Sequence, residues 1–405
     1  MSLFINYWAR PRRASPLNLM VARMLVGLYA AWKVGTYPFA ELASFPPFLF
    51  LENELARQNT FFAPSPEYLS LIPWEQALLV VCLLLVAAGW RLGLTAGLSA
   101  ALLAHLSGLN YLIINEKTFL PIVYFLIFCG LYRHQDRGTW DRWRRSRGQA
   151  PESLKASLLQ HNAGPPPAAL YPPSALRAFL LTFSLIYFFT GWAKWCGGGH
   201  GWAWAAAENV RLIVQKNALY HIHEMPPAAS LVMPHDLAFA VMGNATLLLE
   251  LGFVLAVLAR LPITPFILGL AGMHAGILAT MQLNYLTDML PLYALFLPWD
   301  GLARRLAPTG SWTVTYDGRC RFCLRILQVF RILDVARRLR FVEAPAEAAA
   351  ACRLCVQGAD GIRHEHVDAL SILLGCGGLT RPLAWLVRRG PMRARMGQLA
   401  RRWTA

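Results

Sequence analysis

The sequence predicts a mainly α-helical protein, with a polytopic membrane bundle of about eight spans over residues 1–300 and a small α/β domain over residues 301–405. Of the 405 residues, 56% are hydrophobic and only 15% are charged, a balance typical of membrane proteins. The long apolar stretches also stop near Trp299, and the chain beyond is rich in arginine. The two parts are therefore expected to be separate domains.

Eight apolar stretches approach the length needed to cross a hydrocarbon core of about 30 Å. They fall at residues 17–38, 72–90, 92–113, 117–132, 175–193, 236–259, 262–281 and 284–299. The fourth stretch is short, and the eighth is interrupted by Pro291 and Pro298. The first is long for a signal peptide and has no clear cleavage site, so we expect a signal anchor.

The charges of the loops predict the orientation of these spans. Arginines crowd residues 10–13 and the loop 133–174, whereas the loop 39–70 holds four glutamates against Arg57. Basic loops remain on the cytoplasmic side of a membrane. With eight spans every basic loop falls on that side, so we expect both termini in the cytoplasm and the protein in a bacterial inner membrane.

A net charge of +16 comes almost entirely from arginine. In a membrane protein, anionic lipid headgroups are a better match for this charge than nucleic acid, which we do not expect as a partner. A purely solvated basic face is the alternative. The arginines of the tail are Arg381, Arg388, Arg389, Arg393, Arg395, Arg401 and Arg402.

Polar side chains inside the predicted spans are candidate site residues, because burying them in lipid is costly. Most of them fall toward the outer ends of their spans, which predicts a polar chamber that opens outward. Alternatively, each one only bonds to a neighbouring helix or extends to the interface. The candidates are Lys33, His105, Asn110, Tyr111, Lys194, Glu250, His274, Asn284 and Asp288.

Three segments in these spans resemble landmarks of a known family. They are residues 103–112 (LAHLSGLNYL), 187–194 (YFFTGWAK) and 272–276 (GMHAG). In order and spacing they look like the HTTM family, the membrane domain of vitamin K-dependent gamma-glutamyl carboxylase and its bacterial relatives. The resemblance covers roughly residues 15–300.

The resemblance implies catalytic roles and a quinone or quinol cofactor. Lys194 would be the base that deprotonates the quinol, His105 would assist at the reacting carbon, and His274 matches a further histidine of the family. An apolar chamber disfavours the charged ammonium form of a lysine. The pKa of the lysine therefore falls, and its neutral amine can act as a base. Ala193 replaces a second family lysine, and the large lumenal domain is absent. The resemblance therefore implies quinol-type or carbanion-type chemistry rather than glutamate carboxylation. Asn110, Tyr111, Asn284, Asp288 and Glu250 are the candidate substrate-binding residues.

A metal site in the outer loop 194–235 is an alternative, because imidazoles in a His-x-His pattern can bind zinc or copper. The same segment could equally be a surface strand or an interfacial segment, so no metal is expected firmly. The histidines are His200, His221, His223 and His235.

The C-terminal domain opens with a thiol motif. An alternating segment, residues 312–316, predicts a strand, and Asp317-Gly318 predicts a turn before a helix over residues 320–340. Cys320 would begin this helix, where backbone N–H groups stabilise a thiolate. Cys323 lies three residues later on the same face and could resolve a mixed disulfide.

This domain resembles the DCC family, thioredoxin-like proteins described as thiol-disulfide oxidoreductases. The resemblance covers residues 311–403 and rests on 316–323 (YDGRCRFC), Gly361-Ile362, 366–370 (HVDAL) and 381–386 (RPLAWL). It implies that Cys320 and Cys323 are catalytic and that a cytoplasmic thiol reductant is a partner. A zinc site that adds Cys352 and Cys355, or a domain used only for docking, are alternatives.

Together these patterns predict an integral membrane enzyme with base-initiated chemistry in an outward chamber, coupled to a cytoplasmic dithiol. A second hypothesis is a transmembrane relay that passes electrons between a quinone and a thiol partner. A third is a non-enzymatic factor that binds a lipid or peptide in the chamber.

Overall fold

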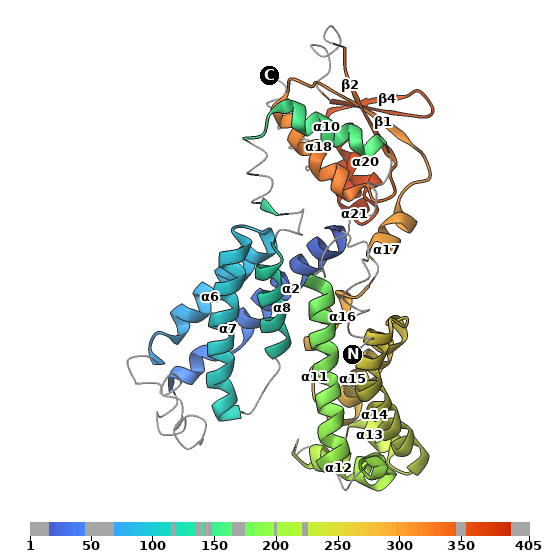
Figure 1. Cartoon of the computed structure of the whole chain (residues 1–405). Coiled ribbons are helices and arrows are strands. Elements are labelled where there is room, and N and C mark those ends of the chain that lie inside the picture. The colour runs from blue at the N-terminus through green and yellow to red at the C-terminus, as the bar shows by residue number, and fades with distance from the viewer. Residues whose placement is uncertain are drawn as a thin grey trace. The chain divides into compact units, whose positions relative to one another are not determined.

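The structure is a computed structural model that describes residues 16–44, 69–114, 119–133, 139–140, 144, 148–163, 175–197, 201–220, 226–297, 299–345 and 354–389 (Figure 1). Two compact units make up the chain. Unit 1 comprises residues 1–12, 22–133 and 172–297, and unit 2 comprises residues 13–21, 134–171 and 298–405. Each unit is described by itself.

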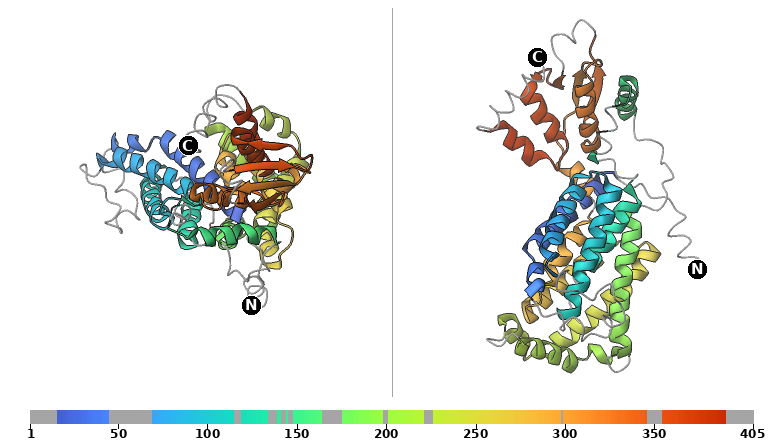
Figure 2. Two further views of the ribbon diagram at one scale, coloured as in Figure 1. Left: turned by 90° about the horizontal axis from the view of Figure 1, so that it is seen from above. Right: turned by 90° about the vertical axis from the view of Figure 1, so that its left-hand side faces the viewer.

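Unit 1 is a bundle of helices, and each of the eight predicted apolar stretches coincides with one of them (Figure 1, Figure 2). Helices that follow each other in sequence pack side by side, notably α7 on α8, α14 on α15 and α15 on α16. Its elements are α2 (Pro16–Thr36), η1 (Phe39–Ser44), α6 (Ile72–Ala88), α7 (Leu92–Ile114), α8 (Leu120–Leu131), α11 (Ala175–Gly197), η4 (Gly201–Ala205), α12 (Ala207–Tyr220), α13 (Pro227–Val232), α14 (Asp236–Ala259), α15 (Thr264–Met281) and α16 (Tyr285–Ala294).

Five of the described helices are long and apolar enough to cross a membrane, namely α2, α7, α11, α14 and α15. The other three predicted stretches form shorter helices. α6 has 17 residues, α8 has 12 and α16 has 10. At 1.5 Å per residue, these three extend about 26, 18 and 15 Å. The described helices thus agree with a helical membrane protein, and five of the eight predicted spans have the length to cross a membrane.

Close contacts of small residues join α2 to α6. A Cβ built on Gly27 would lie 3.0 Å from the Cβ of Ala87, so only glycine fits there. Four residues earlier, the buried guanidinium of Arg23 donates to the carbonyl oxygen of Val86 at 2.6 Å and to that of Ala87. These carbonyls end α6, where a helix has no intrahelical donor for them and favours a positive charge.

Unit 2 is built around a mixed sheet with the strand order β2-β1-β3-β4. β1 runs parallel to β2 and antiparallel to β3, and β3 runs antiparallel to β4. The elements are α10 (Pro151–Asn162), α17 (Trp299–Leu306), β1 (Trp312–Tyr316), α18 (Arg321–Leu333), β2 (Leu339–Glu343), β3 (Leu354–Gly358), β4 (Arg363–Glu365), α20 (His366–Cys376) and α21 (Arg381–Arg388).

The predicted strand at residues 312–316 is confirmed, but the predicted helix over 320–340 ends early, at Leu333. Asp334 ends it, because its buried carboxylate accepts from the backbone N–H groups of Arg338 and Leu339, each at 2.8 Å. The next residues alternate, with Leu339 and Phe341 buried and Arg340 exposed, and this period of two forms β2.

α10 belongs to unit 2, although it lies in the predicted loop between two spans. Leu154 and Leu158 enter the same apolar core as Phe341. At the end of α10, the Asn162 side chain donates to the Phe341 carbonyl at 2.7 Å and accepts from its N–H at 2.9 Å. This amide pairs with the outer edge of β2, which is an edge strand. The C-terminal unit therefore extends beyond the predicted residues 301–405.

Replacing Asn162 with leucine should release α10 from β2. Both backbone groups of Phe341 would lose their partner, which costs about 1–3 kcal/mol. We expect limited proteolysis within residues 148–163 to become faster by more than tenfold. Gln160→Leu, on an exposed position of the same helix, is the matched control. Equal cleavage of both variants would contradict this docking.

Candidate functional site

An ion pair between Lys194 on α11 and Glu250 on α14 forms the centre of the candidate site. The Lys194 Nζ lies 2.5 Å from Glu250 Oε1. The Glu250 side chain is only 3% exposed, whereas that of Lys194 is 25% exposed. The ammonium of Lys194 also lies 5.1 Å from the ring centre of Trp204, within range of a cation–π interaction. The lysine is thus held between a buried carboxylate and an aromatic ring.

An open cavity of about 660 Å³ lies against this lysine. Its volume falls in the range of roughly 300–1,000 Å³ typical of small-molecule pockets. The walls combine the Lys194 amine and the Thr190 hydroxyl with aromatic surface. The lining residues are Phe189, Thr190, Ala193, Lys194, Gly197 and Trp204. Such a wall suits a planar, mostly apolar ligand that carries an acidic hydroxyl or an anionic group.

Gly191 brings the two helices of the ion pair together. A Cβ built on Gly191 would lie 2.9 Å from the Glu250 Cβ and 3.2 Å from the Leu251 side chain. Only glycine therefore allows α14 to approach α11 this closely. Gly191 precedes Lys194 by three residues, so both face the same side of α11. The glycine thus sets the distance across which the lysine meets Glu250.

A chain of buried rings lies beside this pair. The hydroxyl of Tyr187, on α11, lies 3.2 Å from His274 Nε2 and 2.6 Å from the Tyr293 hydroxyl. Two atoms of the group, Glu250 Oε2 and His274 Nδ1, are buried and have no hydrogen-bond partner in the described part of the chain. Buried polar atoms are rarely left unsatisfied, so each is a candidate to meet a water or a ligand.

His105 lies in a different pair from Lys194. Its Nδ1 lies 2.9 Å from Glu75 Oε1, which joins α7 to the first turn of α6. Both side chains are mostly buried, at 15% and 13% exposed. The structure thus brings together Lys194, Glu250 and the Tyr187–His274 pair. The described partner of His105 is Glu75 on α6, which is not part of this group.

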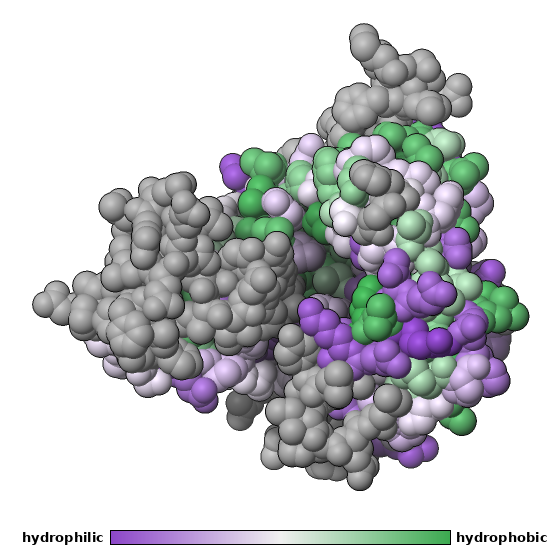
Figure 3. Space-filling view, turned by 90° about the horizontal axis from the view of Figure 1, so that it is seen from below, coloured by the Kyte–Doolittle hydropathy of each residue, from purple (hydrophilic) through white to green (hydrophobic). Residues whose placement is uncertain are grey.

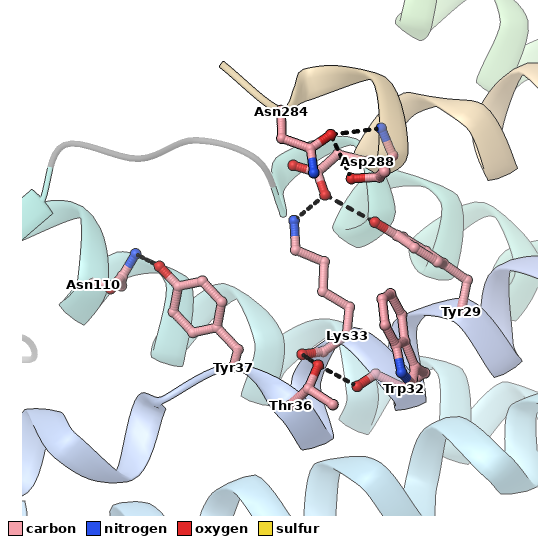
Figure 4. A network of polar contacts seen from close by, with 9 residues as sticks. Tyr29, Trp32, Lys33, Thr36, Tyr37, Asn110, Asn284 and Asp288 are labelled. Atoms are coloured by element: carbon pink, nitrogen blue, oxygen red, sulfur yellow. Dashed lines mark hydrogen bonds and ion pairs between the residues drawn. The ribbon is translucent and has the colours of Figure 1, made fainter. Parts of the chain in front are cut away.

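A second ion pair, Lys33 with Asp288, joins α2 to α16 (Figure 4). Asp288 also accepts from the Tyr29 hydroxyl at 2.8 Å. The Lys33 amine lies 4.6 Å from the ring centre of Phe119. Both side chains of the pair are almost fully buried, at 12% and 8% exposed. Asp288 is therefore committed to a closed contact between two helices.

The remaining candidate substrate residues have local partners. Asn110 is buried and donates to the Tyr37 hydroxyl at 2.9 Å, while its Oδ1 has no partner among the described residues. Asn284 is exposed and caps α16 by accepting from the Thr287 N–H at 3.3 Å. Tyr111 belongs to α7, but its side chain lies outside the described set.

The described parts of the predicted outer loop form the helices η4, α12 and α13, whereas the His221–Met225 segment lies outside the described residues. α12 is amphipathic, with Val210 and Val214 buried and with Glu208 and Lys216 exposed. Figure 3 views the molecule from the end at which α12 lies in Figure 1, and hydrophilic residues form a band there across hydrophobic surface. A helix of this kind fits an interface between membrane and water.

The weak metal candidates are only partly described. His235 is exposed and precedes α14, whereas His200, His221 and His223 lie outside the described residues. Among the residues that the structure describes, no group of three or more histidines, cysteines and acids could hold a metal ion.

The thiol motif begins α18 as predicted. Cys320 is the N-cap, and its Sγ accepts from the Cys323 N–H at 3.4 Å. Cys320 is partly exposed and Cys323 is buried. The turn before them is closed by the Arg319 N–H, which donates to Asp317 Oδ1 at 2.8 Å. This arrangement favours a thiolate at Cys320.

An ion pair from α10 lies next to this turn. Lys155 Nζ lies 2.7 Å from Glu343 Oε1, and both side chains crowd the space a Cβ on Gly318 would occupy. The hydrogen bond to Glu343 raises the pKa of the Lys155 ammonium. The lysine therefore stays positively charged at physiological pH, and it lies against Gly318, which precedes Cys320 by two residues.

The other cysteines of unit 2 differ from Cys320. Cys355 is disulfide-bonded, so it is not a zinc thiolate in this structure, and Cys352 lies outside the described residues. Burial raises the pKa of the Cys376 thiol to about 12. A thiol with so high a pKa is inert near neutral pH.

Several partners in these sites were not predicted from the sequence. Glu75, Tyr187 and Tyr293 complete the contacts of His105 and His274. Tyr29 and Tyr37 complete those of Asp288 and Asn110. The sequence could have indicated a partner for Glu75, because a carboxylate in the first turn of an apolar helix needs one. Nothing in the sequence singled out the tyrosines, since Tyr is common in membrane helices.

Breaking the central ion pair should destabilise unit 1. Lys194→Met leaves Glu250 buried without its counter-charge, at a cost of about 3–5 kcal/mol. The double variant Lys194→Met/Glu250→Leu removes both charges and should recover most of the lost stability. Thermal unfolding in detergent measures both, with the exposed Glu208→Ala as control. A single variant as stable as the wild type would contradict the pairing.

Thiol labelling should separate the cysteines of unit 2. We expect N-ethylmaleimide to modify Cys320 in the native protein near neutral pH at least tenfold faster than Cys376, because Cys320 is partly exposed whereas burial raises the pKa of the Cys376 thiol to about 12. Mass spectrometry of the digested protein measures each site, and unfolding in urea should make both sites react. Fast native labelling of Cys376 would contradict its burial.

Comparison with known proteins gives no match to any family model, any curated protein or any solved structure. The function of the chain therefore has to be inferred from its own residues.

Proposed function

We propose that this chain is an integral membrane enzyme that begins its reaction by removing a proton from a quinol-type or carbanion-forming substrate at Lys194. The observation that carries the proposal is the Lys194–Glu250 pair at the wall of an aromatic cavity. A buried ion pair with no access to a ligand only holds helices together. This pair has its lysine side open and its carboxylate side closed.

The chemistry follows from the arrangement of the pair. When the proton rests on Glu250, Lys194 is a neutral amine, and the pair as a whole stays uncharged. A substrate O–H bond can then break, with its proton passing to the Lys194 nitrogen and its electron pair staying on the substrate oxygen. The ammonium formed lies beside the new anion and stabilises it. The aromatic side chains that line the open cavity lower the local polarity and strengthen that attraction.

The resemblance to the HTTM family supports the same assignment, since it gives the base role to Lys194. His274 and Tyr187 lie in the same group of side chains and would orient the substrate. His105, paired with Glu75, would act from a different helix pair. The eight-span topology, with cytoplasmic termini in a bacterial inner membrane, is part of this proposal.

Unit 2 would act as a thioredoxin-like thiol domain. The Cys320 thiolate would attack a disulfide of a partner, and the leaving sulfur would depart as a thiolate. Cys323 would then attack Cys320, which releases the reduced partner and leaves a Cys320–Cys323 disulfide. The N-cap position of Cys320 supports this step. A cytoplasmic thiol reductant would restore the two thiols.

The same thiol geometry favours a second candidate, a membrane relay between a quinone and a thiol partner. In that case Cys320→Ser abolishes function, while loss of Lys194 has a small effect. The third candidate, a lipid-binding or peptide-binding factor, depends on neither residue beyond stability.

Anaerobic titration with a reduced 1,4-naphthoquinone tests the base role. A bound quinol that loses its hydroxyl proton changes its near-ultraviolet absorption, and we expect the wild type to give the quinolate spectrum near neutral pH. The Lys194→Met/Glu250→Leu variant, chosen because it keeps no unpaired buried charge, should lose the quinolate signal by more than tenfold. Lys216→Ala, on the exposed face of α12, is the control. An unchanged signal in the double variant would overturn the proposal.

A further inference from the structure

Two short helices of unit 2, α17 and α21, expose apolar side chains next to arginines. On α21, Leu383 is 51% exposed, Trp385 is 53% exposed and Leu386 is 47% exposed. On α17, Leu302 and Leu306 are each 40% exposed. Large apolar side chains in such a group mark a surface that meets a partner or a membrane. We call these five side chains the apolar platform.

The apolar residues of α21 lie on two opposite faces. Ala384 and Val387 are buried, and α21 packs on α20 through that side. At 100° per residue, Trp385 and Leu386 each lie about 130° from the middle of that buried face, and Leu383 lies at its border, next to Val387. A helix that only covers a soluble core has one apolar face. The second apolar face of α21 therefore has a different role.

α17 and α21 belong to one surface. The Arg381 guanidinium donates to the Leu306 carbonyl at 3.5 Å. Just before α21, Gly378 packs directly on the backbone of Ala303, with no space for a Cβ, and its φ is +67°. Only glycine meets both demands. The two helices are thus fixed to each other, and their exposed leucines move as one body.

Positive charge borders the apolar platform. Arg304 and Arg305 end α17, and Arg381, Arg388 and Arg389 lie on or next to α21. The Arg389 guanidinium lies 4.1 Å from the ring centre of Trp385. Arginine beside tryptophan and leucine is the composition of helices that lie in a lipid interface. The charges select anionic headgroups, while the apolar side chains enter the acyl region.

A short link joins α17 to the last predicted apolar stretch. α16 ends at Ala294 and α17 begins at Trp299. Five residue steps reach at most about 17 Å, even when fully extended. α16 lies in the last predicted apolar stretch, and it packs on α15, which is long and apolar enough to span. Only this short link therefore separates the last predicted apolar stretch from α17 along the chain.

We propose that α17 and α21 form a membrane-docking surface that binds anionic phospholipid, with Leu383, Trp385 and Leu386 inserted among the acyl chains. This surface would hold unit 2 against the bilayer independently of the chemistry at Lys194. A second copy of the chain or another protein could cover the same apolar side chains, and the experiment separates these occupants.

The test uses the full chain in nanodiscs made of phosphatidylcholine alone or with added phosphatidylglycerol, with acyl chains brominated to quench nearby tryptophan. The difference between wild type and Trp385→Phe isolates the emission of Trp385. We expect this emission to be quenched, and more strongly with phosphatidylglycerol. Emission of Trp385 that is unquenched in both lipids would overturn the proposal.

Amide hydrogen exchange gives a second readout on the same samples. We expect residues 381–389 to exchange more slowly in the anionic nanodiscs, with protection lost by about fivefold for each arginine replaced by glutamine. Arg304→Gln and Arg305→Gln are suitable, because no described hydrogen bond to the core uses their side chains. Protection that depends on protein concentration and not on the lipid would assign the surface to self-association and contradict the proposal.

Discussion

The need to neutralise buried charge governs unit 1. Three polar pairs cross the described part of its apolar interior: the ion pairs of Lys194 with Glu250 and of Lys33 with Asp288, and the hydrogen-bonded His105 and Glu75. Each pair joins two helices, so each also fixes how those helices lie against each other. A single charge of this kind would be costly in an apolar bundle, and removing one partner is worse than removing both. The polar sites of unit 1 lie where they do because each buried charge needs a partner on a neighbouring helix.

The three pairs differ in what they leave open, and that difference singles out Lys194. Lys33 is 12% exposed and shares its carboxylate with a tyrosine, whereas Lys194 is 25% exposed and lines a cavity. Gly191 makes the open pair possible by letting α14 approach. Glu250 keeps one oxygen without a described partner. A site that is charged, paired on one side and open on the other is suited to moving a proton.

The sequence predicted the helices of unit 1 better than their contacts. Long apolar stretches must form helices in a membrane, because backbone groups have no other partners there, and all eight stretches did so. The partners of His105 and His274 could not be predicted, since which side chains meet depends on how the helices pack. In unit 2 the Cys320 helix was predicted but not its end at Asp334, whose carboxylate caps backbone groups only in the folded chain. The packing of α10 on unit 2 could not be predicted either, because it also forms only in the folded chain. The charged loop around α10 resembles an ordinary connection between two spans.

The central claim is that the cavity beside Lys194 binds a planar quinol-type ring. Electron cryo-microscopy of the full chain in nanodiscs with added 1,4-naphthoquinone tests it most directly. The account predicts flat density in this cavity, with an oxygen within hydrogen-bond distance of Lys194 Nζ and the ring against Trp204. An empty cavity, with the naphthoquinone density elsewhere in the bundle, would contradict it.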